Sequence, residues 1–421
     1  MASLEEFNLV TRQWIYYTMA KLFLLSFLTL ALYSFPVEAQ KQLKTLRSLV
    51  KAKNTGEAMK EVSRLESDSV CRMFPELYDL AIKTQVLINN VENEKVYLKK
   101  QCDTVKFFNS TLQIFNYAVK GDSVESYLNA HKKAKFKLRK KHAEMLRMYY
   151  PNLNMGARYF YTRGKYEEAK NLLEMSLLMA RQRMWENQPV DSTHKEFVSN
   201  MYRFTYSAYI TKDYSKVERY KHILLEHPDF SQSVIEIYAR SAEAMHRDAD
   251  FERYLRLGMG KYPREEFFFE ELAKIYMTEK RFADAVNLAD WFYTVQPTSN
   301  KALRLKVQAL YSMQRTDECV EVAKTLAMRD TTLQYPEVNY YVGQLLMSQI
   351  DTITVPTNMF SQEFKTSKMR IKTICAQARP YLERYRVLTP QESAKWAPLL
   401  YKIYLELNLG KEFEEICKIL Q

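Results

Sequence analysis

The sequence predicts an all-α protein built as a solenoid of antiparallel helix hairpins, and three observations support that prediction. Prolines recur at nearly regular intervals in the middle of the chain, at Pro151, Pro189, Pro228, Pro263, Pro297 and Pro336. Between them lie pairs of amphipathic helical patterns joined by short polar turns, which is typical of repeats that bury their apolar faces only against their neighbours. Glycine is scarce, with 8 residues, whereas Tyr, Phe and Met number 30, 22 and 19 and can fill the gaps between stacked helices.

Residues 1–39 are predicted to form a signal peptide. Lys21 precedes an apolar run from Leu22 to Phe35, and Val37-Glu38-Ala39 offers small residues to a signal peptidase before Gln40. Acidic residues ahead of the run are unusual for such a signal, so we expect translation to start at Met19. The predicted location is therefore the periplasm or the exterior, with no stable membrane span left after cleavage.

An uncleaved membrane anchor is the alternative for the same segment, because Trp14 to Phe35 is just long enough to span a bilayer. The net charge of the chain is +12. Such a charge favours acidic partners, an acidic envelope component among them, but says nothing about the fold. The alternative function is a membrane-anchored or cytoplasmic adaptor that binds an acidic partner through its basic face.

The clearest repeat runs from Glu266 to Pro297. Each of its two helical patterns places apolar residues three and four apart, and Glu279-Lys280-Arg281 forms the turn between them. The inward residues are Phe269, Leu272, Ala273 and Tyr276 in the first pattern and Phe282, Ala285, Leu288, Ala289 and Phe292 in the second. Small residues at 273 and 285 let the two backbones approach where the helices cross.

This unit resembles the tetratricopeptide repeat (TPR) family, whose helix hairpins have small crossing residues, an aromatic residue opening the second helix and a closing proline. An earlier unit matches the same pattern at Leu153, Ala157, Phe160, Gly164, Tyr166, Ala169 and Leu173. The resemblance implies a right-handed superhelix of hairpins that binds protein or peptide. Weaker units depart from the pattern: Lys212 and Lys280 replace the turn glycine, and Val217 and Tyr254 replace the crossing alanine.

The predicted organisation has two parts after the signal peptide. Residues 40–149 form three or four divergent helical hairpins, and residues 150–421 form a TPR array of about seven helix pairs. Polar stretches near 184–195 and 351–367 are predicted insertions in the array. Long loops of repeat proteins gather on one face and can carry function, although neutral loop growth explains them equally well.

Known enzyme motifs are missing from the sequence. It has no phosphate-binding G-x-x-x-x-G-K, no G-x-G-x-x-G, no H-E-x-x-H and no G-x-S-x-G. The six histidines and five cysteines lack the spacing of metal ligands, so we expect no metal, no cofactor and no catalytic residue. The cysteines are expected to be buried thiols, with a Cys71–Cys102 bridge as the alternative. An active site without a known motif, in the Asp351–Ser367 region, is the competing hypothesis.

The predicted partner-binding groove lies along the first helices of successive hairpins. Tyrosine and arginine offer wide amphipathic contact at low entropic cost. The candidates are Asn154, Arg158, Tyr161, Tyr202, Tyr206, Tyr209, Glu270, Lys274, Arg304, Gln308 and Tyr311. The alternative is that these side chains pack between helices.

A basic run is the strongest charge feature and the candidate anion-binding patch. Its members are Lys132, Lys133, Lys135, Lys137, Arg139, Lys140 and Lys141. An exported protein rarely meets nucleic acid, so acidic protein, glycan or lipid is the expected ligand, and an ordinary solvated helix face is the alternative.

A recurring Asp-Ser or Asp-Thr pattern resembles a periplasmic O-glycosylation signal. It occurs at Asp68, Asp103, Asp122, Asp191, Asp330 and Asp351. The alternative is that these residues begin helices and turns, where Asp, Ser and Thr are favoured.

Overall fold

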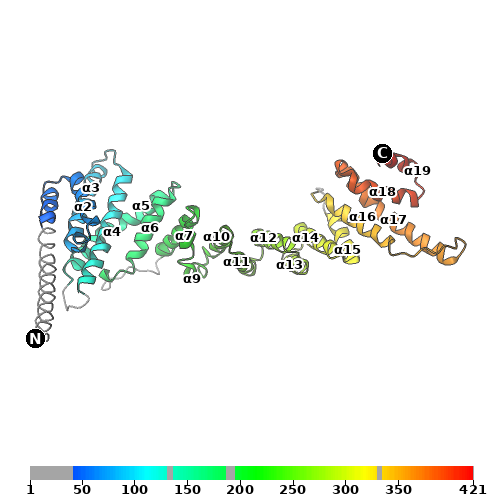
Figure 1. Cartoon of the computed structure of the whole chain (residues 1–421), viewed down its shortest axis with the longest axis horizontal. Coiled ribbons are helices and arrows are strands. Elements are labelled where there is room, and N and C mark those ends of the chain that lie inside the picture. Colours follow the sequence, from blue (N-terminus) through cyan, green and yellow to red (C-terminus); the bar gives the residue numbers. More distant parts are fainter. Residues whose placement is uncertain (1–40, 130–135, 186–194, 330–333, 421) are drawn as a thin grey trace, which may run out of the picture. The chain divides into compact units, whose positions relative to one another are not determined.

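The computed structural model describes residues 41–129, 136–185, 195–329 and 334–420, and these ranges are helical, with no strand among them. The predicted all-α solenoid of TPR-like hairpins is confirmed, because consecutive helices pack against one another along each part of the chain (Figure 1). The chain divides into two compact units, Met1–His227 and Pro228–Gln421.

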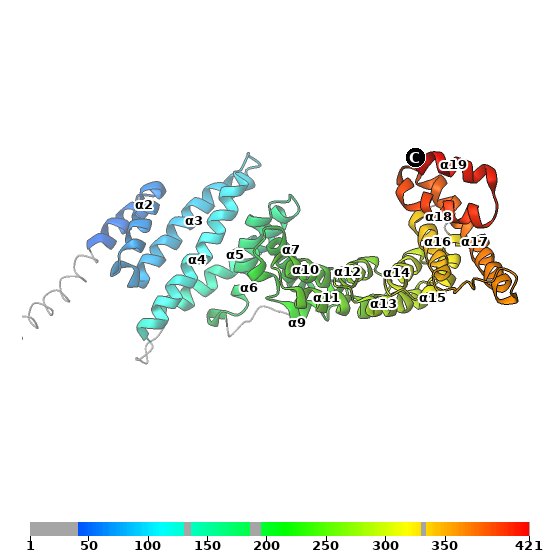
Figure 2. The same cartoon turned by 45° about the vertical axis from the view of Figure 1, so that its right-hand side comes forward.

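The described part of the first unit begins with a helix over residues 41–51, followed by α2 (Thr55–Ser67) and the short turn η1 (Cys71–Met73). The next hairpin pairs α3 (Pro75–Tyr97) with α4 (Thr104–Asn129), which lie side by side (Figures 1 and 2). These two helices have 23 and 26 residues, far longer than those of a TPR. Before α5, the described part of 40–149 holds these two hairpins.

The remaining helices of the first unit follow the TPR pattern less evenly. They are α5 (Lys137–Tyr161), α6 (Tyr166–Met179), η2 (Arg183–Trp185), α7 (Lys195–Ile210), α8 (Tyr214–Val217) and α9 (Lys221–Leu224). Pro151 lies inside α5 instead of ending a helix. A proline there removes a single helical donor, and the exposed face of α5 accommodates its ring. Most of the predicted 184–195 insertion, with Pro189, lies outside the described residues.

The second unit contains the most regular hairpins. They pair α10 (Ser231–Ala244) with α11 (Asp248–Lys261), α12 (Glu266–Thr278) with α13 (Phe282–Val295), and α14 (Asn300–Ser312) with α15 (Thr316–Arg329). Each of these helices has 13 or 14 residues. In the hairpin predicted best, the rings of Phe269 and Phe292 stack at 4.1 Å, which joins its two helices.

Polar contacts in the second unit connect equivalent positions of neighbouring hairpins. Their sequence separations are 33 for Gln232–Glu265, Arg304–Glu337 and Tyr311–Gln344, and 32 for Gln296–Arg264, Arg329–Pro297 and Gln349–Asp317. A constant separation close to the 34 residues of a TPR is what a stack of equal repeats produces.

The unit ends with α16 (Pro336–Ile350), α17 (Gln362–Leu388), η3 (Pro390–Glu392), α18 (Ser393–Glu406) and α19 (Gly410–Leu420). The insertion predicted at 351–367 is shorter than expected, because Ser361 caps α17 by accepting from the Phe364 amide at 3.1 Å. Helix α17 ends at Leu388, just before Thr389 and Pro390, where proline cannot continue the helix.

Close helix approaches depend on glycines that the family pattern does not mark. Tyr254 occupies the expected alanine position of α11, and its ring packs against that of Tyr238 at 5.6 Å. The space for the next helix comes one turn later, where a Cβ on Gly258 would lie 2.3 Å from the Phe268 ring. A Cβ on Gly343 would likewise lie 2.4 Å from Leu382, between α16 and α17.

The turns within hairpins share one backbone conformation. Gly164 has a φ of 71°, and Lys212 and Lys280, which replace glycine, have φ values of 59° and 60°. The other members of the set are Lys53, Lys99, His246, Gln314 and Asn408, with φ between 54° and 55°. The left-handed turn thus persists where the glycine is lost, since tertiary packing holds it.

Candidate partner-binding surface

The best-formed part of the predicted groove is a group of four half-buried tyrosines, the tyrosine cluster: Tyr161, Tyr166, Tyr202 and Tyr206. Tyr161 ends α5, Tyr166 begins α6, and the other two lie on α7. The ring centroid of Tyr206 lies 5.9 Å from that of Tyr161, 5.6 Å from that of Tyr166 and 6.3 Å from that of Tyr202. Three helices therefore build one aromatic surface with edge-to-face contacts.

The phenols of Tyr161 and Tyr206 stay protonated at neutral pH. Burial raises the pKa of Tyr161, and the neighbouring Tyr202, Tyr206 and Tyr166 raise it further. Burial also raises the pKa of Tyr206, with a further contribution from Tyr166. Protonated phenols keep a hydrogen-bond donor beside an apolar ring, which suits contact with a polypeptide.

Helical spacing places Tyr161, Tyr202 and Tyr206 in the predicted groove but leaves Tyr166 out. The family pattern marks Tyr166 only as the aromatic residue that opens a second helix. The turn between α5 and α6 is so short that this residue reaches the same surface, and the rings of Tyr161 and Tyr166 are 5.5 Å apart. Similarly, predicted Tyr209 lies 6.5 Å from Tyr214, which the prediction also omits.

Asn154 makes hydrogen bonds between helices. Its Oδ1 accepts from Ser176 Oγ at 2.6 Å and from Asn200 Nδ2 at 3.2 Å, so it connects α5, α6 and α7. Asn200 Oδ1 in turn accepts from Arg203 at 2.8 Å. Asn154 thus supports the surface from behind, whereas Arg158 is exposed on α5 one turn before Tyr161.

Groove candidates of the second unit form cross-helix pairs. Lys301 on α14 donates to Glu266 at 2.6 Å and also to Glu270, both on α12. Lys274 is exposed and lies 3.7 Å from Glu271.

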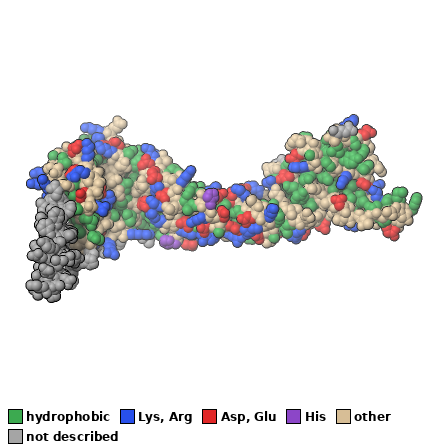
Figure 3. Space-filling model, in the orientation of Figure 1, with side chains coloured by type: hydrophobic (Ala, Val, Ile, Leu, Met, Phe, Trp, Pro, Cys, Tyr) green, Lys and Arg blue, Asp and Glu red, His purple; other side chains and the backbone are tan. Residues whose placement is uncertain are grey.

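The three candidates on α14 are half-buried. Arg304 Nε donates to Glu337 at 2.9 Å, and the Tyr311 hydroxyl donates to Gln344. The rings of Tyr311 and Tyr341 are 4.3 Å apart. Gln308 lies between Arg304 and Tyr311 along the helix. Figure 3 shows blue and red side chains interspersed on the visible face of the unit, in agreement with this pairing.

Among the described residues of the predicted anion-binding patch, two basic side chains are paired with carboxylates. Arg139 donates to Asp122 at 2.6 Å and lies over the Phe136 ring, and Lys141 donates to Asp79 at 2.9 Å. Lys140 is exposed. Lys132, Lys133 and Lys135 lie outside the described residues, and for Lys137 only the backbone is described.

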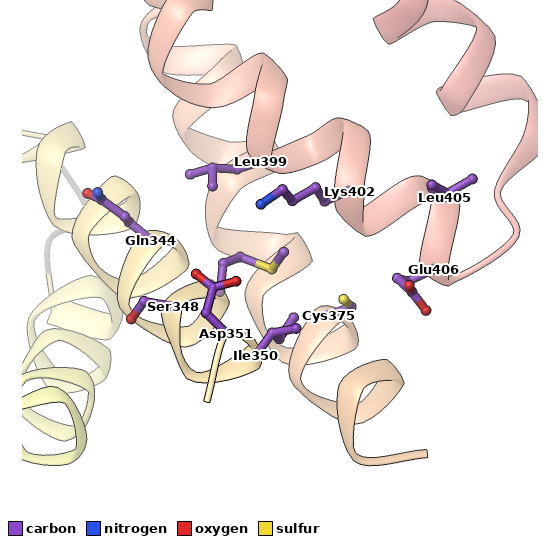
Figure 4. Close-up of a pocket in the computed structure, with 10 residues that line it drawn as sticks. Gln344, Ser348, Ile350, Asp351, Cys375, Leu399, Lys402, Leu405 and Glu406 are labelled. Atoms are coloured by element: carbon purple, nitrogen blue, oxygen red, sulfur yellow. The ribbon is translucent and has the colours of Figure 1, made fainter. Parts of the chain in front are cut away.

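A pocket of about 270 Å³ borders the region proposed for a motif-free active site, and Asp351 is the one residue of that region among its lining residues. Asp351 points into it from the end of α16 and Lys402 reaches in from α18, with Cys375 and Glu406 on the other side (Figure 4). Burial raises the pKa of the Cys375 thiol to about 11, so the thiolate needed for nucleophilic attack is scarce. Glu406 is paired with Lys368 at 2.7 Å. These groups lack a nucleophile activated by a base.

The cysteines carry free thiols, and two aspartates of the Asp-Ser/Thr pattern begin helical turns. All five cysteines are free, so Cys71 and Cys102 are not bridged. Asp68 accepts from the amide of Cys71 at 2.7 Å, and Asp103 accepts from that of Lys106 at 2.9 Å, as residues that begin helical turns do. Within the described part of the chain, no three His, Cys, Asp or Glu side chains converge to hold a metal ion. No helix described here has the length and apolar character needed to cross a membrane.

No family model and no curated protein matches the chain. Among solved structures, a chain of the Naa15/Naa10 complex bound to HypK-THB is 11% identical with a TM-score of 0.31, covering 91% of this chain and 63% of that one. The TPR domain of P58(IPK) is 10% identical with a TM-score of 0.23, covering 84% and 99%. A putative Podosopora anserina kinesin light chain with TPR-like repeats is 14% identical with a TM-score of 0.18, covering 60% and 98%. The helix bounds and repeat spacing described above carry the fold assignment.

Proposed function

We propose that this protein is a non-catalytic scaffold that binds a protein or peptide on the tyrosine cluster of its first unit. The observation that carries the proposal is the convergence of four half-buried tyrosines from α5, α6 and α7 on one surface. Their rings are held against one another, so little side-chain freedom is lost on binding. Tyrosine and arginine dominate the binding energy of many interfaces, and Arg158 is exposed on α5 one turn before Tyr161.

We further propose that the scaffold works in the periplasm after removal of residues 1–39. The apolar run from Leu22 to Phe35 and the small residues before Gln40 support this location. Sequencing the N-terminus of the protein purified from its own cells tests it, with Gln40 expected as the first residue. A first residue at Met1, Ala2 or Met19 contradicts cleavage.

A photo-crosslinking experiment tests the binding surface. A benzophenone side chain replaces Tyr206 in one variant and Asn171 in a control, because Asn171 is exposed on α6 away from the cluster. We expect a discrete cross-linked protein band in the envelope fraction only with the probe at 206. With the probe at 206, Arg158→Ala and Tyr202→Phe should each weaken the band, while circular dichroism stays unchanged. Equal cross-linking from both positions, or none from 206, contradicts the proposal.

A further inference from the structure

A cavity of about 510 Å³ opens in the first unit, away from the tyrosine cluster. It lies between the end of the first described helix, the middle of α3 and the start of α5. Its apolar wall consists of Val50, Ile82, Val86, Leu87 and Met145. The volume is within the range of pockets that enclose a drug-sized ligand.

The charged groups around this cavity are strongly unbalanced. Four lysines line it, Lys51, Lys53, Lys83 and Lys141, and Asp79 is the single carboxylate among the lining residues. The four lysines and Asp79 together carry a net charge of +3. An apolar concavity with such a rim attracts anions, because low-dielectric walls strengthen the field of the lysines.

Asp79 holds two of these lysines in place. Its carboxylate accepts from Lys83 Nζ at 2.9 Å and from Lys141 Nζ at 2.9 Å, and His142 Nε2 lies 2.9 Å from Oδ1. The Asp79 side chain is 11% exposed, whereas those of Lys83 and Lys141 are 50% and 55% exposed. An ammonium group has three donors, so each lysine uses one on Asp79 and keeps two directed elsewhere.

We propose that this cavity binds a single-chain amphiphile with an anionic head group, either a carboxylate or a phosphate monoester. The hydrocarbon chain lies against Ile82, Val86 and Met145, and the head group accepts from Lys83 and Lys141 at the rim. A folded protein partner would need an extended face, whereas this site is a concavity of small-molecule size lined by apolar side chains and four lysines. The inference does not depend on the peptide-binding function proposed above.

Calorimetric titration of the whole chain tests the proposal, with decanoate and decyl phosphate below their micellar concentrations as probes. We expect saturable binding of at least one of them, which also identifies the preferred head group. Binding of decanol should be at least tenfold weaker, and decylammonium should not bind. If decanol or decylammonium binds as tightly as the anions, the assigned role of the lysines is wrong.

Variants locate the site. Lys83→Gln combined with Lys141→Gln should weaken anion binding about tenfold or more, and Val86→Trp should abolish binding by filling the cavity. Lys140→Gln is the matched control, because Lys140 is the exposed neighbour of Lys141 but does not line the cavity. Thermal melts confirm that each variant folds, and the lysine pair still tests the site if Val86→Trp does not fold. Equal weakening by Lys140→Gln overturns the proposal.

Two further measurements separate the amphiphile from macromolecular partners. An octaglutamate peptide and vesicles of anionic phospholipid are offered to the same protein. If either one binds in a manner that requires Lys83 and Lys141 while decanoate and decyl phosphate do not bind, the rim serves a peptide or a membrane and the cavity proposal fails.

Discussion

A β-carbon added to Gly258 would lie only 2.3 Å from the ring of Phe268, which begins the inward face of the next hairpin. The Phe268 ring is completely buried, so it has nowhere to move. Helices α11 and α12 can pack at this distance because residue 258 has no side chain.

Gly258→Ala should therefore destabilise the second unit by about 1–3 kcal/mol through overpacking. Gly260→Ala is the control in the same helix, because nothing lies within 4 Å of a Cβ at that position. It should be neutral or stabilise by up to about 1 kcal/mol, since alanine favours the helix. Urea denaturation followed by circular dichroism compares the two, and equal effects would contradict the packing argument.

Lys280→Gly should stabilise the protein, because Lys280 occupies a left-handed turn with a φ of 60°. That conformation costs an L-residue about 1–2 kcal/mol, while glycine adds about 0.5–1 kcal/mol of unfolded-state entropy. The expected net gain is roughly 0.5–1 kcal/mol in the free energy of unfolding. Lys274→Gly, in the interior of α12, should instead cost about 1 kcal/mol. A loss of stability at both positions would show that the turn is not strained.

Three of the five cysteines should resist alkylation by iodoacetamide in the native protein at about pH 8. Burial raises the pKa of the Cys319 thiol to about 12, and it raises those of Cys71 and Cys375 to about 11. The reactive thiolate is therefore scarce at these sites. Cys102 and Cys417 are half-exposed and should be labelled first. Peptide mass spectrometry after a time course measures the order in which the cysteines are alkylated. Equal labelling of Cys319 and Cys417 would contradict the prediction.

Asp79→Asn should destabilise the first unit by about 2 kcal/mol at neutral pH, because the buried carboxylate accepts from Lys83, Lys141 and His142. Although burial alone would raise the pKa of Asp79, these donors outweigh it and hold the pKa well below its ordinary value of 3.8. Because the pKa of Asp79 is lower in the folded than in the unfolded chain, its carboxylate stabilises the fold at any pH above its unfolded-state pKa. That stabilisation is lost as the pH falls toward its folded-state pKa.

The difference in unfolding free energy between the natural protein and Asp79→Asn should therefore be constant from about pH 7 to about pH 5 and shrink below about pH 4. Urea denaturation at several pH values measures it. Asp122→Asn is a useful comparison, because Asp122 pairs with Arg139 in the same unit. If the difference in unfolding free energy instead grows as the pH falls, the lowered pKa of Asp79 does not explain it.

The fold was predictable wherever a helix buries one face at a regular interval. Phe269, Leu272, Phe292 and Cys319 are all buried as the periodicity of three and four predicts. The break between α8 and α9 was not predictable, since the departure at Val217 indicates only an imperfect crossing and not where the helix stops. The length of α3 and α4 also escaped prediction, because apolar periodicity does not mark where a long helix ends.

The candidate surface was predictable in composition but not in pairing. Helical spacing placed Tyr161, Tyr202 and Tyr206 on first helices, and all three are half-buried in the structure. It could not show that Asn154 bonds to Ser176, or that Arg304 bonds to Glu337, because such partners depend on which neighbouring helix lies opposite. Tyr166 was missed for the same reason, since the geometry of a turn decides where the first residue after it points.

The pairing of Arg304 with Glu337, and of Lys301 with Glu266, has a mechanical consequence. Helices α10 to α15 contact chiefly the helices next to them in the chain, and these ion pairs join hairpins that are immediate neighbours. Tension applied along this segment should unfold one hairpin at a time, while the remaining hairpins stay folded and allow the opened one to refold. The segment from α10 to α15 should therefore extend reversibly under tension.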